Sequence, residues 1–144
     1  MWWNRRNGEA RRAVEAVVAA FNTRDFATLA SYLLPAFTLV DGVGERVSGR
    51  DQALSLLERL TTADPQFRMV VEELTSHGDD VFVSGYTTGF QRSCAPQRTL
   101  WKVLFRGGRI AEWHSFSADT AQPSVRLLKD GVEGRSSLRV AAPC

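Results

Sequence analysis

Residues 97–117 read QRTLWKVLFRGGRIAEWHSFS and carry the clearest structural signal in the chain. Two runs in which aromatic and aliphatic residues alternate with polar ones flank the tripeptide Arg106-Gly107-Gly108. Glycine is favoured in tight hairpin turns because it adopts backbone angles that other residues avoid. The pattern therefore predicts two antiparallel strands, over residues 97–106 and 109–117.

The residues just upstream extend this hairpin into a meander. Apolar alternation predicts strands over residues 66–75 and 81–90, joined by the polar turn His77-Gly78-Asp79-Asp80. In the strand that follows them, Trp101 and Val103 share one face, since successive side chains of a strand point to opposite sides. We expect this apolar face to point toward the helices.

The first third of the chain shows the period of amphipathic helices instead. Apolar residues at positions i, i+3, i+4 and i+7 predict a helix from about Gly8 to Phe21. Asp25 is expected to cap a second helix, whose apolar stripe includes Leu29 and Leu33. Pro35 should end this helix, because proline disfavours helical angles in the residue before it.

A short strand and a third helix are expected to follow. Residues 37–41 predict the strand, and Gly42 and Gly44 predict a turn after it. Ser48 and Asp51 have the spacing of a capping box, so Ser48 is expected to cap the helix. The buried face of that helix carries Ala53, Leu56, Leu57 and Leu60.

The order of these elements predicts fold class α+β, with three N-terminal helices packed on one face of a curved, mostly antiparallel sheet. One domain is expected over residues 8–117, after an N-terminal extension of residues 1–7. Residues 118–144 contain scattered aliphatic residues broken by glycine and serine. We expect them to form a poorly ordered tail.

The composition is typical of one soluble domain. The chain has 144 residues, of which 44% are hydrophobic and 24% charged, enough for a single sizeable core. A net charge of +2 is too small to favour nucleic acid as a partner. The sequence also lacks an apolar stretch of the length that a membrane span or signal peptide needs. We therefore expect neither nucleic acid nor a membrane as a partner.

The reactive residues fit no common catalytic or metal-binding motif. Cys94 and Cys144 have no metal-ligand spacing and suit a reducing compartment, so a cytoplasmic location is expected. His77 and His114 are far apart in the sequence, and phosphate-binding glycine loops and nucleophile elbows are missing from it. We expect no metal and no cofactor. A site must then be assembled from scattered residues in a pocket.

The order of these predicted elements, and the residues between them, resemble those of a known superfamily. The carriers of the resemblance are Asn22-x-x-Asp25 between two helices, a strand ending in Asp41, the segment Ser48-Gly49-Arg50-Asp51-Gln52-Ala53, and the closing Gly108-Arg109-Ile110-Ala111-Glu112-Trp113. Together they resemble the SnoaL-like and ketosteroid-isomerase-like branch of the nuclear transport factor 2-like superfamily, over roughly residues 8–117. The resemblance implies a cone-shaped fold with a pocket between the bent sheet and the helices. It also implies a homodimer through the outer face of the sheet.

The resemblance further implies which side chains face the pocket. Comparison with the family puts Trp113 inward and His114 outward, and spacing back along the sheet puts Ser84 and Tyr86 inward. We expect a small apolar organic ligand. The residues expected to contact it are Val17, Phe21, Phe37, Leu56, Phe82, Ser84, Trp101, Val103, Trp113 and Ser115.

Asp41 is the residue singled out for chemistry. It matches the general-base aspartate of ketosteroid isomerases, in which a carboxylate at an apolar cavity takes a proton from carbon and returns it one position away. Tyr86 is the candidate hydroxyl from another wall of the pocket. The alternative is that Asp41 only begins the Gly42 turn, because aspartate readily hydrogen-bonds its own backbone there.

The remaining machinery of the known branches is missing. The oxyanion tyrosine of the isomerases would fall at Val17 and its partner acid at Trp101, so their preorganised donors are lost. The epoxide-hydrolase pattern needs ionisable groups at about Ser115, Phe82 and Ser84, and the cyclase pattern needs an acid near Ser115 and a histidine near Trp101. Ordinary ketosteroid isomerization and epoxide hydrolysis are therefore not expected.

Two functions from different classes remain open. The first is a proton-transfer enzyme, catalysing isomerization, cyclization or dehydration with Asp41 as its base. The second is a non-catalytic ligand-binding or dimerisation module with the same fold. A cavity well below about 300 Å³ would favour the second, because pockets for drug-sized ligands are larger.

Overall fold

The computed structural model describes residues 2–89 and 96–117 and contains three helices and six strands within them. In chain order the elements are α1 (Trp2–Asn22), α2 (Phe26–Ser31), β1 (Leu33–Val40), β2 (Arg46–Ser48), α3 (Arg50–Ala63), β3 (Arg68–His77), β4 (Asp80–Thr88), β5 (Gln97–Arg106) and β6 (Arg109–Ser117). The α+β class and the helices-then-sheet order predicted from the sequence are confirmed.

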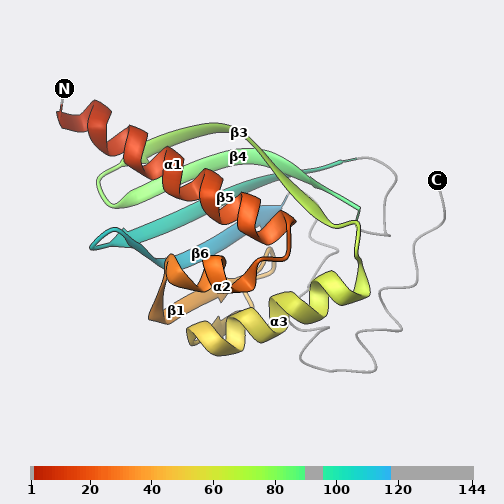
Figure 1. Cartoon of the computed structure of the whole chain (residues 1–144). Coiled ribbons are helices and arrows are strands. Elements are labelled where there is room, and N and C mark those ends of the chain that lie inside the picture. The colour runs from red at the N-terminus through yellow and green to blue at the C-terminus, as the bar shows by residue number, and fades with distance from the viewer. Residues whose placement is uncertain (1, 90–95, 118–144) are drawn as a thin grey trace.

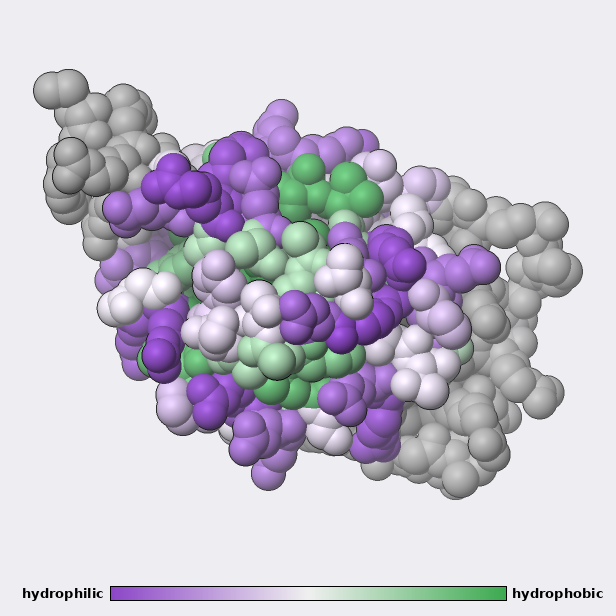
Figure 2. Space-filling view, viewed as in Figure 1, coloured by the Kyte–Doolittle hydropathy of each residue, from purple (hydrophilic) through white to green (hydrophobic). Residues whose placement is uncertain are grey.

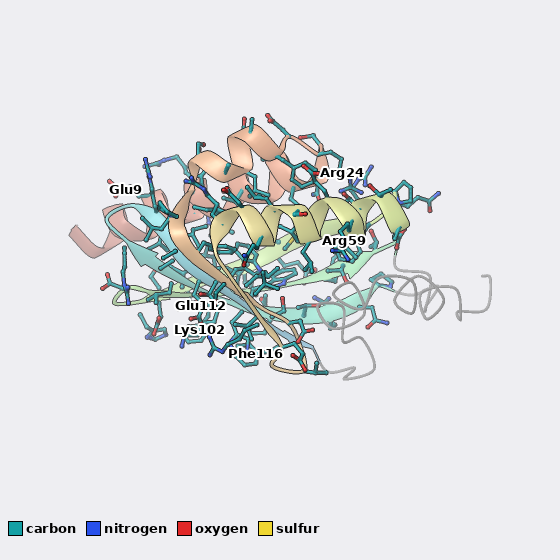
Figure 3. All side chains as sticks on the ribbon, turned by 90° about the horizontal axis from the view of Figure 1, so that it is seen from below. Glu9, Arg24, Arg59, Lys102, Glu112 and Phe116 are labelled. Atoms are coloured by element: carbon teal, nitrogen blue, oxygen red, sulfur yellow. The ribbon has the colours of Figure 1, made fainter. Side chains whose placement is uncertain are left out.

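The six strands form one sheet in the order β2-β1-β6-β5-β4-β3. Neighbouring strands are antiparallel except β1 and β6, which run parallel. The three helices lie on one face of the curved sheet, as the ribbon and the view from below show (Figures 1 and 3). Polar residues dominate the outside of this helix-covered side, with apolar patches between them (Figure 2).

The core lies between the helices and the inner face of the sheet. Val14 of α1, Val83 of β4 and Val103 of β5 are fully buried. Ile110 is also fully buried, and Trp101 is almost fully buried. Burial alternates strictly along β4, which means that one face of this strand packs on the core and the other does not. Folding is thus driven by one continuous apolar cluster under the helices.

The N-terminal helix is longer than the sequence pattern predicted. We expected it to begin near Gly8, whereas α1 begins at Trp2. The prediction followed the apolar stripe, which starts later, but a helix can continue past the end of its buried stripe. The proposed domain limits themselves stay a prediction, and residues 118–144, including the expected tail, lie outside the described residues.

The turn after α1 ties the helix layer to the sheet through backbone-directed hydrogen bonds. Arg24, in the left-handed region at φ 63°, donates from its guanidinium to the carbonyl oxygens of Phe21, Pro65 and Phe67. Burial lowers the pKa of Arg24, and the nearby Arg68 adds to this effect. The guanidinium therefore acts as a clamp between α1 and the loop that leads into β3.

Asp25 caps α2 as expected, accepting a hydrogen bond from the backbone N–H of Thr28 at 3.1 Å. However, the second helix ends at Ser31, and Leu33 begins β1 instead of continuing the apolar stripe of the helix. Pro35 lies inside β1, where the pairing with β6 is irregular between Leu33 and Thr38. A proline fits there because the ladder does not need its missing N–H.

The capping box predicted at the start of the third helix is wrong. Gly49, at φ 100°, occupies the cap of α3, and no side chain makes the capping hydrogen bond. Ser48 is instead the last residue of β2, paired with Thr38 of β1. The Gly49 N–H donates to the Phe37 carbonyl oxygen at 2.8 Å, so the chain leaves the sheet only at the glycine.

Candidate functional site

A cavity of about 150 Å³ lies between the three helices and the inner face of the sheet. Its wall combines residues from the helices with residues from β1, β3, β4, β5, β6 and the connecting loops. The lining residues are Val17, Phe21, Leu29, Leu33, Phe37, Leu39, Val40, Asp41, Gly42, Leu56, Leu57, Leu60, Phe67, Met69, Thr87, Gln97, Thr99, Trp101, Trp113 and Ser115. Most of these side chains are apolar, as is usual for small-molecule sites.

Two tryptophans form a corner of this wall. The rings of Trp101 and Trp113 have centroids 6.1 Å apart and planes tilted by 50°. The register puts both on the inner face, since Trp101 pairs with Ser115 and Trp113 pairs with Val103 on the same side of the sheet. Both rings are almost fully buried, which holds them in fixed orientations.

The space for Trp101 depends on a glycine in the neighbouring strand. A Cβ at Gly85 of β4 would lie 3.2 Å from Cζ3 of Trp101 and only 1.9 Å from the carbonyl oxygen of Val70 in β3. No side chain fits there without moving the backbone of β3. Gly85 therefore lets β3, β4 and the indole ring approach closely.

The polar lining residues gather where the strands end on one side of the sheet. Asp41 follows β1, Ser115 lies near the end of β6, Thr87 lies near the end of β4, and Thr99 lies near the start of β5. Gln97 is opposite Thr87 in the β4–β5 ladder. The cavity thus has an apolar body and one end that carries hydroxyl, amide and carboxylate groups.

Asp41 is 5% exposed and combines two local roles. Its carboxylate oxygen Oδ1 accepts hydrogen bonds from the backbone N–H groups of Val43 and Glu45, both at 3.0 Å. Its own backbone N–H donates to the Glu45 carbonyl oxygen, and its carbonyl oxygen accepts from Gly44. The residue therefore organises the turn between β1 and β2, and it also forms part of the cavity wall.

The structure brings together most of the residues selected from the sequence. In addition to Asp41, the cavity wall includes Val17, Phe21, Phe37, Leu56, Trp101, Trp113 and Ser115. Val103 does not line the cavity, contrary to expectation. It is fully buried in a row with Val81 and Trp113, where neighbouring side chains enclose it.

The predicted direction of three side chains in β4 is wrong. Phe82, Ser84 and Tyr86 belong to the less buried positions of this strand, whereas Val81 and Val83 of the alternate set are buried. The cause is the register, in which Trp113 pairs with Val103 and Val103 with Val81, so an error of one residue moves every side chain to the opposite face.

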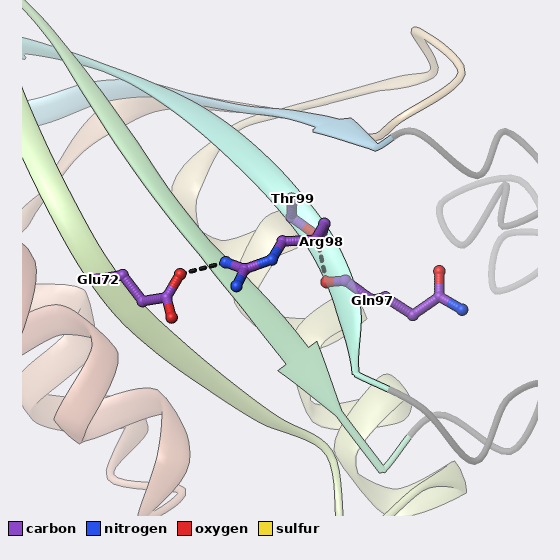
Figure 4. A network of polar contacts seen from close by, with 4 residues as sticks. All are labelled: Glu72, Gln97, Arg98 and Thr99. Atoms are coloured by element: carbon purple, nitrogen blue, oxygen red, sulfur yellow. Dashed lines mark hydrogen bonds and ion pairs between the residues drawn. The ribbon is translucent and has the colours of Figure 1, made fainter.

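Tyr86 therefore lies outside the cavity and does not face Asp41. Arg98 of β5 packs over its ring, with the guanidinium carbon 5.5 Å from the ring centroid. Arg98 also forms an ion pair with Glu72 of β3, which raises the pKa of the guanidinium (Figure 4). Tyr86 belongs to a cross-strand polar cluster on the outer face, and it is not a hydroxyl donor to the cavity.

His114 lies on the outer face, as expected. Its ring stacks on Phe116, with centroids 4.0 Å apart, and its Nδ1 is 3.9 Å from a Glu112 carboxylate oxygen. Desolvation lowers the pKa of His114. The positive charges of Arg46 and Lys102 lower this pKa further, whereas Glu112 and Asp41 raise it. Figure 3 shows Lys102, Glu112 and Phe116 on the side of the sheet away from the helices.

Sequence reasoning missed the polar end of the cavity. Thr99 and Gln97 lie two and four residues before Trp101, so strand alternation from Trp101 puts both on the inner face. That signal was present in the sequence. Thr87 was missed for another reason, because it lies on the face of β4 that was predicted to point outward.

Within residues 2–89 and 96–117, no group of three or more His, Cys, Asp or Glu side chains could hold a metal ion. None of the helices in those residues is both long and apolar enough to cross a membrane. Cys94 and Cys144 lie outside the described residues.

Comparison with known families gives one clear match. The model of the SnoaL-like domain family matches residues 14–113, which include β1, α3 and most of the sheet. A search of curated proteins found no significant match. The match reaches every element that lines the cavity.

Solved structures show the same fold at low sequence identity. A proposed SnoaL-like polyketide cyclase from Jannaschia sp. CCS1 has 17% identity and a TM-score of 0.69, with 88% of this chain and 93% of that chain covered. A proposed ketosteroid isomerase from Kribbella flavida DSM 17836 has 16% identity and a TM-score of 0.68, covering 81% and 83%. A nuclear transport factor 2-like protein of unknown function from Cytophaga hutchinsonii ATCC 33406 has 20% identity and a TM-score of 0.62, covering 74% and 88%. These similarities establish a nuclear transport factor 2-like fold.

Proposed function

The chain belongs to the SnoaL-like domain family, and from this premise we propose that it binds a small, mostly apolar organic molecule and transfers a proton on it with Asp41 as general base. The substrate class is a small carbonyl compound, and the reaction is an isomerization, cyclization or dehydration. The observation that carries the proposal is a buried carboxylate in the wall of a largely apolar cavity. A carboxylate in such a place can accept a proton from a carbon atom next to a carbonyl group.

The size of the cavity limits the substrate. At about 150 Å³ it is smaller than the roughly 300–1,000 Å³ of pockets for drug-sized ligands. It is close to an engineered apolar cavity of about 150 Å³ that admits benzene. The proposal is therefore restricted to molecules of about one small ring, and steroids are excluded from it.

The groups beside Asp41 suggest a slow reaction. Val17 and Trp101 line the cavity at the two positions where the resemblance to ketosteroid isomerases puts the oxyanion donors. Neither side chain is an acidic donor for an enolate oxygen. Among the described lining residues, the polar end offers the hydroxyl groups of Ser115, Thr87 and Thr99 and the Gln97 amide. Losing one oxyanion donor typically costs about 10²–10³-fold in rate.

Proton exchange in heavy water tests the base directly. Cyclopentanone would be incubated with the protein in D₂O, and loss of the proton signal next to the carbonyl would be followed by NMR. Asp41→Asn preserves an oxygen that can accept from Val43 and Glu45 but removes the base, so catalysed exchange should fall to the buffer rate. Asp51→Asn is the matched control, because the Asp51 side chain is 95% exposed on α3. Equal exchange with wild type and Asp41→Asn would refute the catalytic role.

A non-catalytic ligand-binding or dimerisation module is the alternative, and two observations favour it. The hydrogen bonds from Val43 and Glu45 give Asp41 a sufficient structural reason to be there, and the cavity is smaller than most ligand pockets. In this case a small ligand would stabilise the protein without being turned over. A thermal shift with cyclopentanone but no exchange would support this alternative.

We further propose a homodimer through the outer face of the sheet. Leu100 and Phe116 are paired across β5 and β6, and both are more than 40% exposed. Charged residues of both signs surround them, including Lys102 and Glu112 on the same face. An apolar centre with mixed charges around it suits a two-fold contact, in which each patch meets its own copy.

A further inference from the structure

We propose that the ligand of the cavity carries a small alkylated ammonium group, bound against Trp101 and Trp113 with Asp41 as its counter-charge. The inference rests on the proposed function only in requiring that the cavity takes up a ligand. It does not require proton transfer. The cavity volume limits only the size of the ligand, and the inference adds a requirement for a positive charge on it.

The two indole rings provide the first argument. The faces of aromatic rings carry negative electrostatic potential, and tryptophan attracts a cation most strongly within about 6 Å of its centroid. Trp101 and Trp113 meet at 50° with centroids 6.1 Å apart, so one group in their corner can contact both rings. Phe21 and Phe67, which also line the cavity, are in edge-to-face contact and enlarge the aromatic surface.

The charges of the lining residues provide the second argument. Among the described residues that line the cavity, Asp41 is the only one with an acidic or basic side chain. The positively charged Lys102 lies on the opposite face of the sheet. An anionic ligand would meet a carboxylate and the negative faces of the indoles, whereas a cation is attracted by both. The cavity wall therefore favours a positively charged ligand over a negatively charged one.

The polar groups determine what kind of cation fits. A primary ammonium is strongly hydrated and has three N–H groups to satisfy. Most of the wall is apolar and offers few acceptors, so the cost of removing water from such a group would be high. A trimethylammonium group spreads its charge under methyl groups that can pack on apolar side chains. Its bulk is similar to that of benzene, which a cavity of this volume admits.

Isothermal titration with a cationic compound and its neutral isostere tests the inference on the wild-type protein. Choline chloride and 3,3-dimethyl-1-butanol have nearly the same shape, and only choline carries the charge. Sodium chloride at equal concentration corrects for ionic strength. We expect choline to bind about tenfold more tightly or better, the ratio that about 1.4 kcal/mol produces. Equal or tighter binding of the neutral alcohol would overturn the inference but leave the ligand pocket intact.

Two variants separate the contributions. Asp41→Asn should weaken choline binding about tenfold and leave the neutral alcohol within about twofold, because only the charge changes. Trp113→Leu should also weaken choline more than the alcohol, with circular dichroism used to check that it folds. An unchanged choline affinity in Asp41→Asn would overturn the role of the carboxylate. If choline, the neutral alcohol and cyclopentanone all fail to bind the wild type, both this inference and the proposed pocket function fail, whereas binding of cyclopentanone alone would contradict only the inference.

Discussion

The side-chain amide of Asn22 pairs with the backbone of Met69 through two hydrogen bonds. Asn22 Nδ2 donates to the Met69 carbonyl oxygen at 2.8 Å, and the Met69 N–H donates to Asn22 Oδ1 at 2.9 Å. Because β3 is an edge strand, the amide satisfies backbone groups that no strand would otherwise pair. Met69 also lines the cavity, so this contact holds the end of α1 and one cavity wall together.

Replacing Asn22 by alanine should destabilise the protein. Two partly buried backbone groups of Met69 would lose their partner, at a cost of about 1–3 kcal/mol for each unsatisfied group that water cannot reach. Urea unfolding followed by tryptophan fluorescence would measure the loss. Ser31→Ala is the control, since its hydrogen bond to the Thr28 carbonyl oxygen is local and exposed. Equal unfolding midpoints for both variants would contradict the bridging role.

Substituting Gly85 by alanine should be among the most damaging single-methyl changes in this chain. The new Cβ would meet the Val70 carbonyl oxygen at 1.9 Å, so β3 or Trp101 must move. Overpacking of this kind costs about 1–3 kcal/mol or more. Gly8→Ala in α1 offers a contrast, because its nearest neighbour is at 3.7 Å and alanine favours helix by about 1 kcal/mol. In thermal denaturation, the melting temperature should fall for Gly85→Ala and rise for Gly8→Ala.

The stability of the protein should rise with pH through the range in which His114 titrates. The folded state lowers the pKa of this histidine, so the unfolded chain binds its proton more readily. Stability is then lost as the pH falls below about 6.5, the ordinary value for histidine. His114→Gln should flatten the melting temperature between about pH 5 and 7. A wild-type profile that matches the variant across this range would disprove the assignment.

Charge placed at Phe116 should prevent self-association. Phe116 is 43% exposed beside Leu100, so Phe116→Asp should leave the fold intact, while a two-fold contact would bring two like charges together. Sedimentation velocity at several concentrations would show a dimer for wild type and a monomer for the variant. Arg59→Ala on α3, away from the outer face of the sheet, serves as the surface control and should remain a dimer. A monomeric wild type would remove the homodimer proposal.

The parts of the fold that were predictable are those in which the sequence pattern and the final environment agree. The 97–117 hairpin has strong alternation and a glycine turn, and both strand ranges are confirmed. The Asp25 cap depends only on neighbouring residues and is confirmed as well. Ser48 shows the reverse case, because pairing with Thr38 in the sheet overrides a local capping pattern.

The site was predictable only in part, since its geometry depends on register. Residues of β5 were assigned to the correct face from their own alternation and those of β6 from the family resemblance, and Trp101 and Trp113 both line the cavity. The faces of β4 were inferred across two turns, and Tyr86 was placed inside when it lies outside. The sequence also offered two alternatives for Asp41, and both its turn bonds and its position in the wall are present.

The parallel pairing of β1 with β6 has a consequence for biosynthesis. Leu33 pairs with Ile110 and Leu39 pairs with Trp113. The strand that precedes Asp41, β1, therefore gains its neighbour β6 only after almost all of the described residues have been synthesised. Contacts between distant parts of a chain form slowly, because a long loop must close first. A nascent or truncated chain that ends before residue 109 would leave β1 and β5 with open edges that favour aggregation. The cavity is thus completed only when nearly all of the domain has left the ribosome.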